Sequence, residues 1–216
     1  MSIFDAGVFY PIIEIRWYMD KLKEITDSIN KEQIENIKDL QYYYPEYENL
    51  IKSSTPLLNK TIKIYIYEEK FLFDLDFNII IESDCGKSEI WVASSINDVN
   101  RLWRFLESLT FDKSEYCYYV DEEGPNTFLY IKPINHNDIR VLHISDRRQV
   151  SPAIEFDNVK ILQDFIINKK NFINSLYKEL LRIISNSNED EADEYKFGDF
   201  ERLNKDSQII KRYLSV

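Results

Sequence analysis

The feature that most constrains the fold is a run of alternating apolar residues between positions 62 and 82. These residues fall on every second position, first at Ile62, Ile64 and Ile66 and then at Phe71, Phe73, Leu75, Phe77, Ile79 and Ile81. Period-two spacing places such side chains on one face of a strand, and a helix does not readily produce it. The pattern therefore predicts a long strand with one buried face.

The residues that follow predict a hairpin and then a helix. Residues 83–87 form a turn signal, in which Gly86 can take the positive φ that a tight turn needs. A return strand is expected over 89–93. Helical spacing of apolar residues follows, so a serine-capped helix with one apolar stripe is expected over 94–109.

The second half of the chain shows the same order of strands followed by a helix. Alternation predicts strands over 116–120, 127–131, 139–144 and 153–156. Asp157 can then cap a long C-terminal helix over 159–184. Because short turns join neighbouring strands, we expect an α+β fold of mainly antiparallel sheet with helices packed on one face.

The N-terminal segment combines two patterns. Alternation predicts a short strand over 8–18, and Pro11 places it at a sheet edge or at the start of the strand. Helical spacing follows over 20–40, with a break expected near Asn30. Pro45 then opens a short helix.

These patterns predict one α+β domain over residues 1–185. Within it, residues 1–58 form a helical N-terminal lobe, and residues 59–185 hold the sheet and its helices. Residues 186–216 are expected to be an acidic linker followed by a short helix, because five acids fall within Glu189–Glu194.

The charge balance restricts the kinds of partner. The chain has 38 acidic and 27 basic side chains, so its formal net charge is −11 at pH 7. Such a surface repels nucleic-acid phosphates and an acidic membrane, so neither is expected as a partner. Opposite fields steer association, which favours a basic protein partner, although solubility alone also explains the charge. No secretion signal or long apolar run is present, so the cytoplasm is the expected location.

Paired carboxylates offer one possible metal site. Asp74 and Asp76 share a strand face, and Glu68 and Glu69 precede them. Such groups can bind a divalent metal or share general acid–base work. The solvent face of a half-buried strand explains them more simply, so no metal or other cofactor is expected.

Other motifs do not identify a reaction. His136 and His143 lack metal-ligand spacing; we expect the first in an exposed loop and the second half-buried on a strand. The four glycines are too far apart for a phosphate-binding loop. Arg147 and Arg148 could clamp an anion, but pairing with neighbouring acids is the simpler interpretation.

Two groups of tyrosines stand out among the 15 in the chain. The first lies at positions 42–47 and the second at positions 116–119, and three acids follow the second group at positions 121–123. Tyrosine supplies contact area and a hydrogen-bonding tip at protein interfaces, and nearby acids suit a basic surface. Core packing is the alternative for the tyrosines. The predicted partner-binding residues are Tyr42, Tyr43, Tyr44, Tyr47, Asp121, Glu122 and Glu123.

This profile is similar in kind to that of the immunity proteins that bacteria keep against their neighbours' toxins. Those proteins are small, acidic and single-domain, and they lack a catalytic motif. The resemblance implies a non-enzymatic inhibitor that occludes a basic toxin or nuclease domain. Two alternatives stay open: a metal-dependent enzyme using the strand carboxylates, and a phage-encoded acidic decoy that mimics DNA against a host nuclease.

Overall fold

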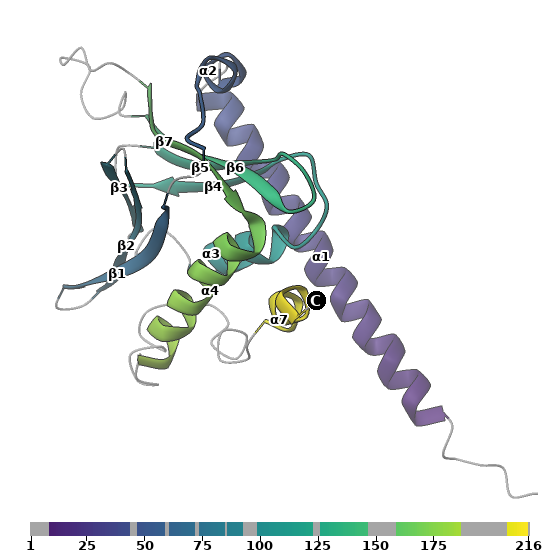
Figure 1. The fold of residues 1–216 in the computed structure, drawn as a ribbon. Coiled ribbons are helices and arrows are strands. Elements are labelled where there is room, and N and C mark those ends of the chain that lie inside the picture. Colours follow the sequence, from purple (N-terminus) through teal and green to yellow (C-terminus); the bar gives the residue numbers. More distant parts are fainter. Residues whose placement is uncertain are drawn as a thin grey trace, which may run out of the picture.

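The computed structural model describes residues 9–43, 47–58, 61–71, 74–84, 86–92, 99–122, 126–146, 159–186 and 207–215. Its helices are α1 (Phe9–Tyr43), α2 (Tyr47–Ser53), α3 (Val99–Ser108), α4 (Lys169–Asn186) and α7 (Gln208–Ser215). Its strands are β1 (Lys63–Phe71), β2 (Asp74–Ser83), β3 (Gly86–Val92), β4 (Tyr116–Asp121), β5 (Asn126–Pro133), β6 (Asp138–Asp146) and β7 (Val159–Asn168). They form two antiparallel sheets, β1-β2-β3 and β4-β5-β6-β7, which confirms the α+β class (Figure 1).

The alternating run of residues 62–82 forms two paired strands, which corrects the prediction of one long strand. In the register of β1 and β2, Ile64 pairs with Ile81, and Phe71 pairs with Asp74. The apolar residues that join the large core are even in β1 (Ile64 and Ile66) and odd in β2 (Phe77, Ile79 and Ile81), as this antiparallel register requires for side chains on one face. The change of phase after Ile66 is therefore the sequence signal of the hairpin.

The hairpin predicted at residues 83–87 is confirmed. Ser83 pairs with Gly86 across a two-residue loop, and Gly86 has a φ of +133°. A residue with a Cβ rarely adopts this φ, so glycine relieves the strain that another residue would introduce. The strand that follows, β3, is the predicted return strand with slightly different bounds.

Residues 159–168 form strand β7, so the helix predicted over 159–184 begins ten residues too early. A register shift opposite His143 and Ile144 leaves Leu162 as an extra residue in β7. Such a bulge inverts the alternation, so Ile161 and Phe165 contact the apolar clusters on opposite faces of the sheet. The resulting apolar spacing resembles that of a helix. The observed cap of α4 is Asn168, whose Oδ1 accepts a hydrogen bond from the Asn171 backbone N–H at 3.2 Å.

The first 35 described residues form a single helix, α1, which corrects both the strand predicted over 8–18 and the break near Asn30. Pro11 lies in the first turn, where backbone N–H groups have no partner within the helix, so the missing N–H of proline is tolerated there. Helix propagation is cooperative, so the helix that the apolar spacing of residues 20–40 predicts continues back through residues 9–18, whose own pattern is ambiguous. The short α2 confirms the helix predicted after Pro45.

The β4–β7 sheet is covered on both faces. On the inner face, β4–β7 pack against α3, α4, α7 and the β1–β3 sheet, in a core that includes Trp103, Phe105, Phe165 and Phe172. On the outer face, α1 and α2 cover a smaller core around Leu40 and Phe128. The helices therefore lie on two sides of this sheet rather than on one (Figure 1).

The predicted C-terminal helix is confirmed as α7, and it joins the inner core through Ile210. Ser207 caps it: the Ser207 Oγ accepts a hydrogen bond from the Ile210 backbone N–H and donates one to the buried Glu107 carboxylate at 2.8 Å. Trp103 Nε1 donates to the same carboxylate. The predicted serine cap at 94–95, the strand at 153–156, Asp157 and the acidic linker lie outside the described residues, and the domain division at 185 stays a prediction.

Candidate functional site

The structure separates the four predicted tyrosines. Tyr42, near the end of α1, is 80% exposed. Tyr47 is buried in the outer core, where its ring packs edge-on against Tyr130 with centroids 6.0 Å apart. The side chain of Tyr43 and all of Tyr44 lie outside the described residues. Tyr42 is therefore the described tyrosine of this group that a partner can reach, and Tyr47 has the packing role of the alternative interpretation.

The predicted acids lie at the other end of β4. Glu122 accepts a hydrogen bond from the Trp91 backbone N–H at 3.0 Å and so joins the end of β4 to β3. Asp121 is half-buried, and Glu123 lies outside the described residues. Tyr47 packs on Tyr130, which pairs with Cys117, four positions and about 13 Å from Asp121 along β4. The two groups therefore do not form one continuous surface around β4.

A groove runs between α1 and the segment before β4. It encloses about 470 Å³ and is lined by Gln33, Ile34, Ile37, Lys38, Gln41, Lys113, Ser114 and Glu115. We call it the α1 groove. Ile34, which is 56% exposed, Lys38 and Tyr42 follow one another at four-residue spacing, so they lie on one side of the helix. Tyr42, a predicted partner-binding residue, thus continues an exposed strip of apolar, basic and aromatic side chains beside the groove.

Polar contacts hold α1 in place along the groove. The Gln33 side-chain oxygen accepts a hydrogen bond from the Cys117 backbone N–H, and the Asn36 amide donates to the Cys117 carbonyl, each at 3.0 Å. Glu32 forms ion pairs with Arg101 and Arg104 of α3. The groove is therefore built on a fixed helix rather than on a loop.

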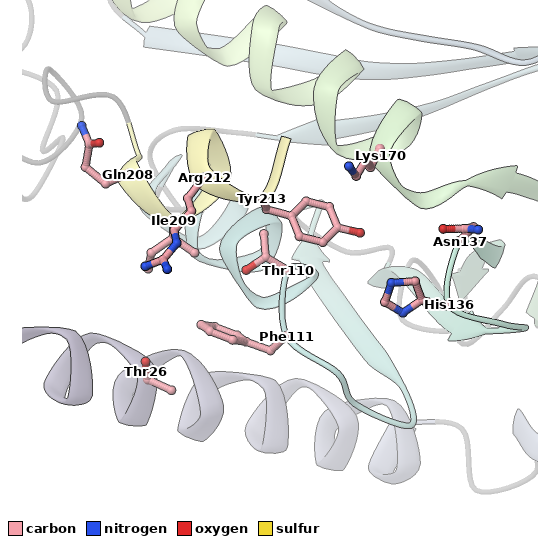
Figure 2. A pocket seen from close by; sticks show the side chains of 10 residues that line it. All are labelled: Thr26, Thr110, Phe111, His136, Asn137, Lys170, Gln208, Ile209, Arg212 and Tyr213. Carbon is pink, nitrogen blue, oxygen red and sulfur yellow. The ribbon is translucent and has the colours of Figure 1, made fainter. Parts of the chain in front are cut away.

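A second hollow lies where α7 meets the rest of the fold. It encloses about 480 Å³ and is lined by Thr26, Thr110, Phe111, His136, Asn137, Lys170, Gln208, Ile209, Arg212 and Tyr213. We call it the α7 pocket. Figure 2 shows Tyr213 extending from α7 toward His136 and Asn137, with Phe111 between α7 and α1. The backbone N–H of Lys169 donates to the Asn137 carbonyl at 2.7 Å, which fixes the β5–β6 loop to the start of α4.

The possible metal ligands do not form a described cluster. Asp76 is buried on β2, while the side chains of Asp74, Glu68 and Glu69 lie outside the described residues. Among the side chains that the structure does describe, no three His, Cys, Asp or Glu residues lie together in a way that could hold a metal ion.

The histidines differ more than expected. His136 is exposed, as predicted, and lines the α7 pocket. His143 is fully buried rather than half-buried, and its Nδ1 lies 2.9 Å from the Ser88 Oγ of β3. Burial lowers the pKa of His143 from 6.5 to about 4, so it is neutral at pH 7 and connects the two sheets. Arg147 and Arg148 lie outside the described side chains.

The sequence interpretation missed the basic residues of the α7 pocket. Lys170 was assigned to the middle of a long helix, whereas it lies in the first turn of α4. Two adjacent lysines directly after a capping asparagine, Asn168, are the signal that could have located both the helix start and the pocket. Arg212 reaches the pocket only through the packing of α7, which no local pattern predicts.

Comparisons with known proteins do not extend this description: no protein-family model, curated protein or solved structure matches the chain. Within the residues that the structure describes, no helix is both long and apolar enough to span a membrane.

Proposed function

We propose that this protein is a non-enzymatic protein-binding module that occludes a basic toxin or nuclease domain, in the manner of an immunity protein, and that α1 is its main docking element. The observation that carries the proposal is the placement of α1. Its 35 residues span about 52 Å. Its N-terminal half continues past the rest of the described chain (Figure 1).

The sequence of the projecting half supports a protein partner. Ten of the 17 residues in positions 9–25 are apolar or aromatic, including Trp17. A helical segment of this composition is typical of an interaction site, because apolar side chains are stabilised when a partner covers them. The α1 groove and the exposed Ile34 and Tyr42 continue this element toward its C-terminal end.

Charge favours a basic partner over a second copy of the chain. The net charge of −11 makes two copies repel each other, whereas it attracts a basic domain and speeds the encounter. Apolar contacts along α1 would then hold the complex. This division of roles predicts an association rate that falls as salt rises and a dissociation rate that depends on α1 side chains.

The test is calorimetric titration with a basic toxin domain encoded beside the gene, at low and high salt, together with an assay of that domain's toxicity. We expect tight binding and loss of toxicity. Ile34→Arg and Tyr42→Ala should each weaken binding by about tenfold or more, which corresponds to about 1.4 kcal/mol. Tyr67→Ala is the matched control, because Tyr67 is also an exposed tyrosine but lies on β1.

Four results would contradict the proposal. Absence of binding at both salt concentrations would contradict the proposed partner. An equal loss of affinity in Tyr42→Ala and Tyr67→Ala would contradict α1 as the docking surface. Thermal stabilisation by Mg²⁺, Mn²⁺ or Ca²⁺ would favour the metal-dependent enzyme instead. Capture of a DNA-binding host nuclease, with strong salt dependence, would favour the acidic decoy.

A further inference from the structure

The α7 pocket is a basic cavity in an acidic protein. Lys170, Arg212 and His136 line it, and none of its described lining residues is Asp or Glu. The chain as a whole has 38 acidic and 27 basic side chains, so the local balance is opposite to that of the protein. No ion pair formed by the described residues includes Lys170 or Arg212. Lys170 and Arg212 therefore bring positive charge to the pocket that no ion pair of the described residues neutralises.

A buried lysine lies beside the pocket, against the ring of its lining residue Tyr213. Lys169 is only 5% exposed, and its Nζ lies 5.8 Å from the ring centre of Tyr116 and 5.5 Å from that of Tyr213. Its hydrogen bond to the Phe111 carbonyl is long, at 3.5 Å. Burial lowers the pKa of Lys169, and the nearby Asp112 acts in the opposite direction. The two rings compensate part of the cost of burying the ammonium group, and an anion in the pocket would compensate more.

The start of α4 points to the same ligand charge. Its first turn contains Lys169 and Lys170 and no acid, and Asn168 caps it. The N-terminus of a helix carries partial positive charge, so lysines there reduce helix stability, whereas an anion bound there is favoured. Two lysines at this position are therefore unfavourable for folding alone and favourable for binding an anion.

The shape of the pocket sets the size of the ligand. In Figure 2, Lys170, His136 and Asn137 lie toward one end and Arg212 toward the other, with the Tyr213 ring between them. A volume of about 480 Å³ falls within the range of sites for small organic molecules. The aromatic rings offer contact to a flat or apolar group, and the lysine end suits a doubly charged phosphate.

From these observations we infer that the α7 pocket binds a small organic phosphate of about nucleotide size. The phosphate lies at the start of α4, near Lys170 and His136. The organic part contacts Tyr213 and Phe111, and Arg212 meets a second acceptor group. This site is separate from the α1 groove, so its test does not depend on the proposed protein partner.

The experiment is calorimetric titration of the full chain with adenosine 5′-monophosphate, ribose 5-phosphate, inorganic phosphate and adenosine. We expect the two organic phosphates to bind more tightly than inorganic phosphate, and adenosine to bind weakest. Lys170→Ala and Arg212→Ala should each weaken binding of the organic phosphates by about tenfold or more. Lys178→Ala is the matched control, since Lys178 is an exposed lysine of the same helix and its loss removes the same charge.

A second readout separates binding from a structural role. Lys170→Glu should raise the melting temperature of the free protein, because an acid suits the first turn of α4, and should abolish stabilisation by the phosphates. The inference is overturned if neither organic phosphate binds at millimolar concentration, or if adenosine binds as tightly as its phosphate. Equal weakening by Lys170→Ala and Lys178→Ala would also overturn it, since the binding would then reflect only general charge.

Discussion

The two faces of the β4–β7 sheet are held by different kinds of contact. The inner face packs through a large apolar core to which both sheets and three helices contribute. The outer face has a smaller core, and α1 lies on it through Gln33 and Asn36, which hydrogen-bond to the Cys117 backbone of β4, while Glu32 of α1 pairs with Arg101 and Arg104 of α3. Apolar burial is non-directional and strong in sum, whereas such polar contacts fix a position at a modest net gain.

This difference assigns different roles to the two faces. The inner face supplies most of the stability of the fold. The outer face positions α1, whose N-terminal half projects beyond the rest of the described chain. A buried ion pair on the same face, Arg140 with Asp164 at 2.7 Å, joins α2 to the sheet, because the Arg140 guanidinium also donates to the Ile51 and Ser54 carbonyls. Specific contacts thus orient the proposed docking helix.

The largest expected effect comes from removing an inner-face side chain. Phe172→Ala leaves a cavity under α4, where Phe172 is fully buried, and should lower the free energy of unfolding by about 3–5 kcal/mol. Urea unfolding measures it. Leu162→Ala, at the exposed bulge of β7, is the control and should cost less than about 1 kcal/mol. Similar losses in both variants would contradict the dominance of the inner face.

An intermediate effect is expected from acid at the junction of the two sheets. His143 titrates at 6.5 when unfolded and at about 4 when folded, so the unfolded state binds the proton first as the pH falls. Its contribution to stability is complete above about pH 6.5 and decreases toward pH 4, by up to about 3 kcal/mol.

The measurement is the free energy of unfolding of the wild type and of His143→Leu between pH 7 and pH 4. The variant lacks the proton-linked loss, so the difference between the two curves should change with pH over this window. Parallel curves for the wild type and His143→Leu would refute the role of the buried histidine.

The smallest effect concerns the ion pairs that join α1 to α3. Glu32→Gln weakens the ion pairs between α1 and α3 and should lower the free energy of unfolding by about 1 kcal/mol. The Glu32 side chain is 15% exposed, so water still screens part of its charge. Hydrogen exchange should increase in α1 and stay unchanged in α4. Glu35→Gln, at an exposed carboxylate one turn away, is the control. Faster exchange in α4 would show that the two faces are not independent.

Local sequence patterns predicted the elements in which the spacing of the apolar side chains is regular. The turn at Gly86, the stripe of α3, the strands β4 to β6 and the short α7 follow from alternation, helical spacing and turn chemistry. Tyr42 was predicted to bind a partner; its side chain is exposed, and the binding stays a prediction. In the predicted helices and strands, the periodicity of the segment itself decides the face on which each side chain lies.

The sequence predictions were wrong or incomplete where contacts from distant parts of the chain decide the outcome. The bulge at Leu162 makes β7 face both cores, so its apolar spacing mimics a helix. Tyr47 belongs to a group of tyrosines that suits an interface, yet it is buried and packs on Tyr130. The α7 pocket is assembled from distant segments, so no single stretch of sequence reveals it.

By itself, the sequence determined the α+β class, most strands, the helical ends of the chain and its acidic charge, because these depend on short-range periodicity and composition. Only the tertiary structure decided which tyrosine stays exposed, which histidine is buried and where basic side chains gather. Those outcomes depend on contacts between residues far apart in the chain, such as the pairing of Cys117 with Gln33 and Asn36 and the docking of α7 beside Lys169.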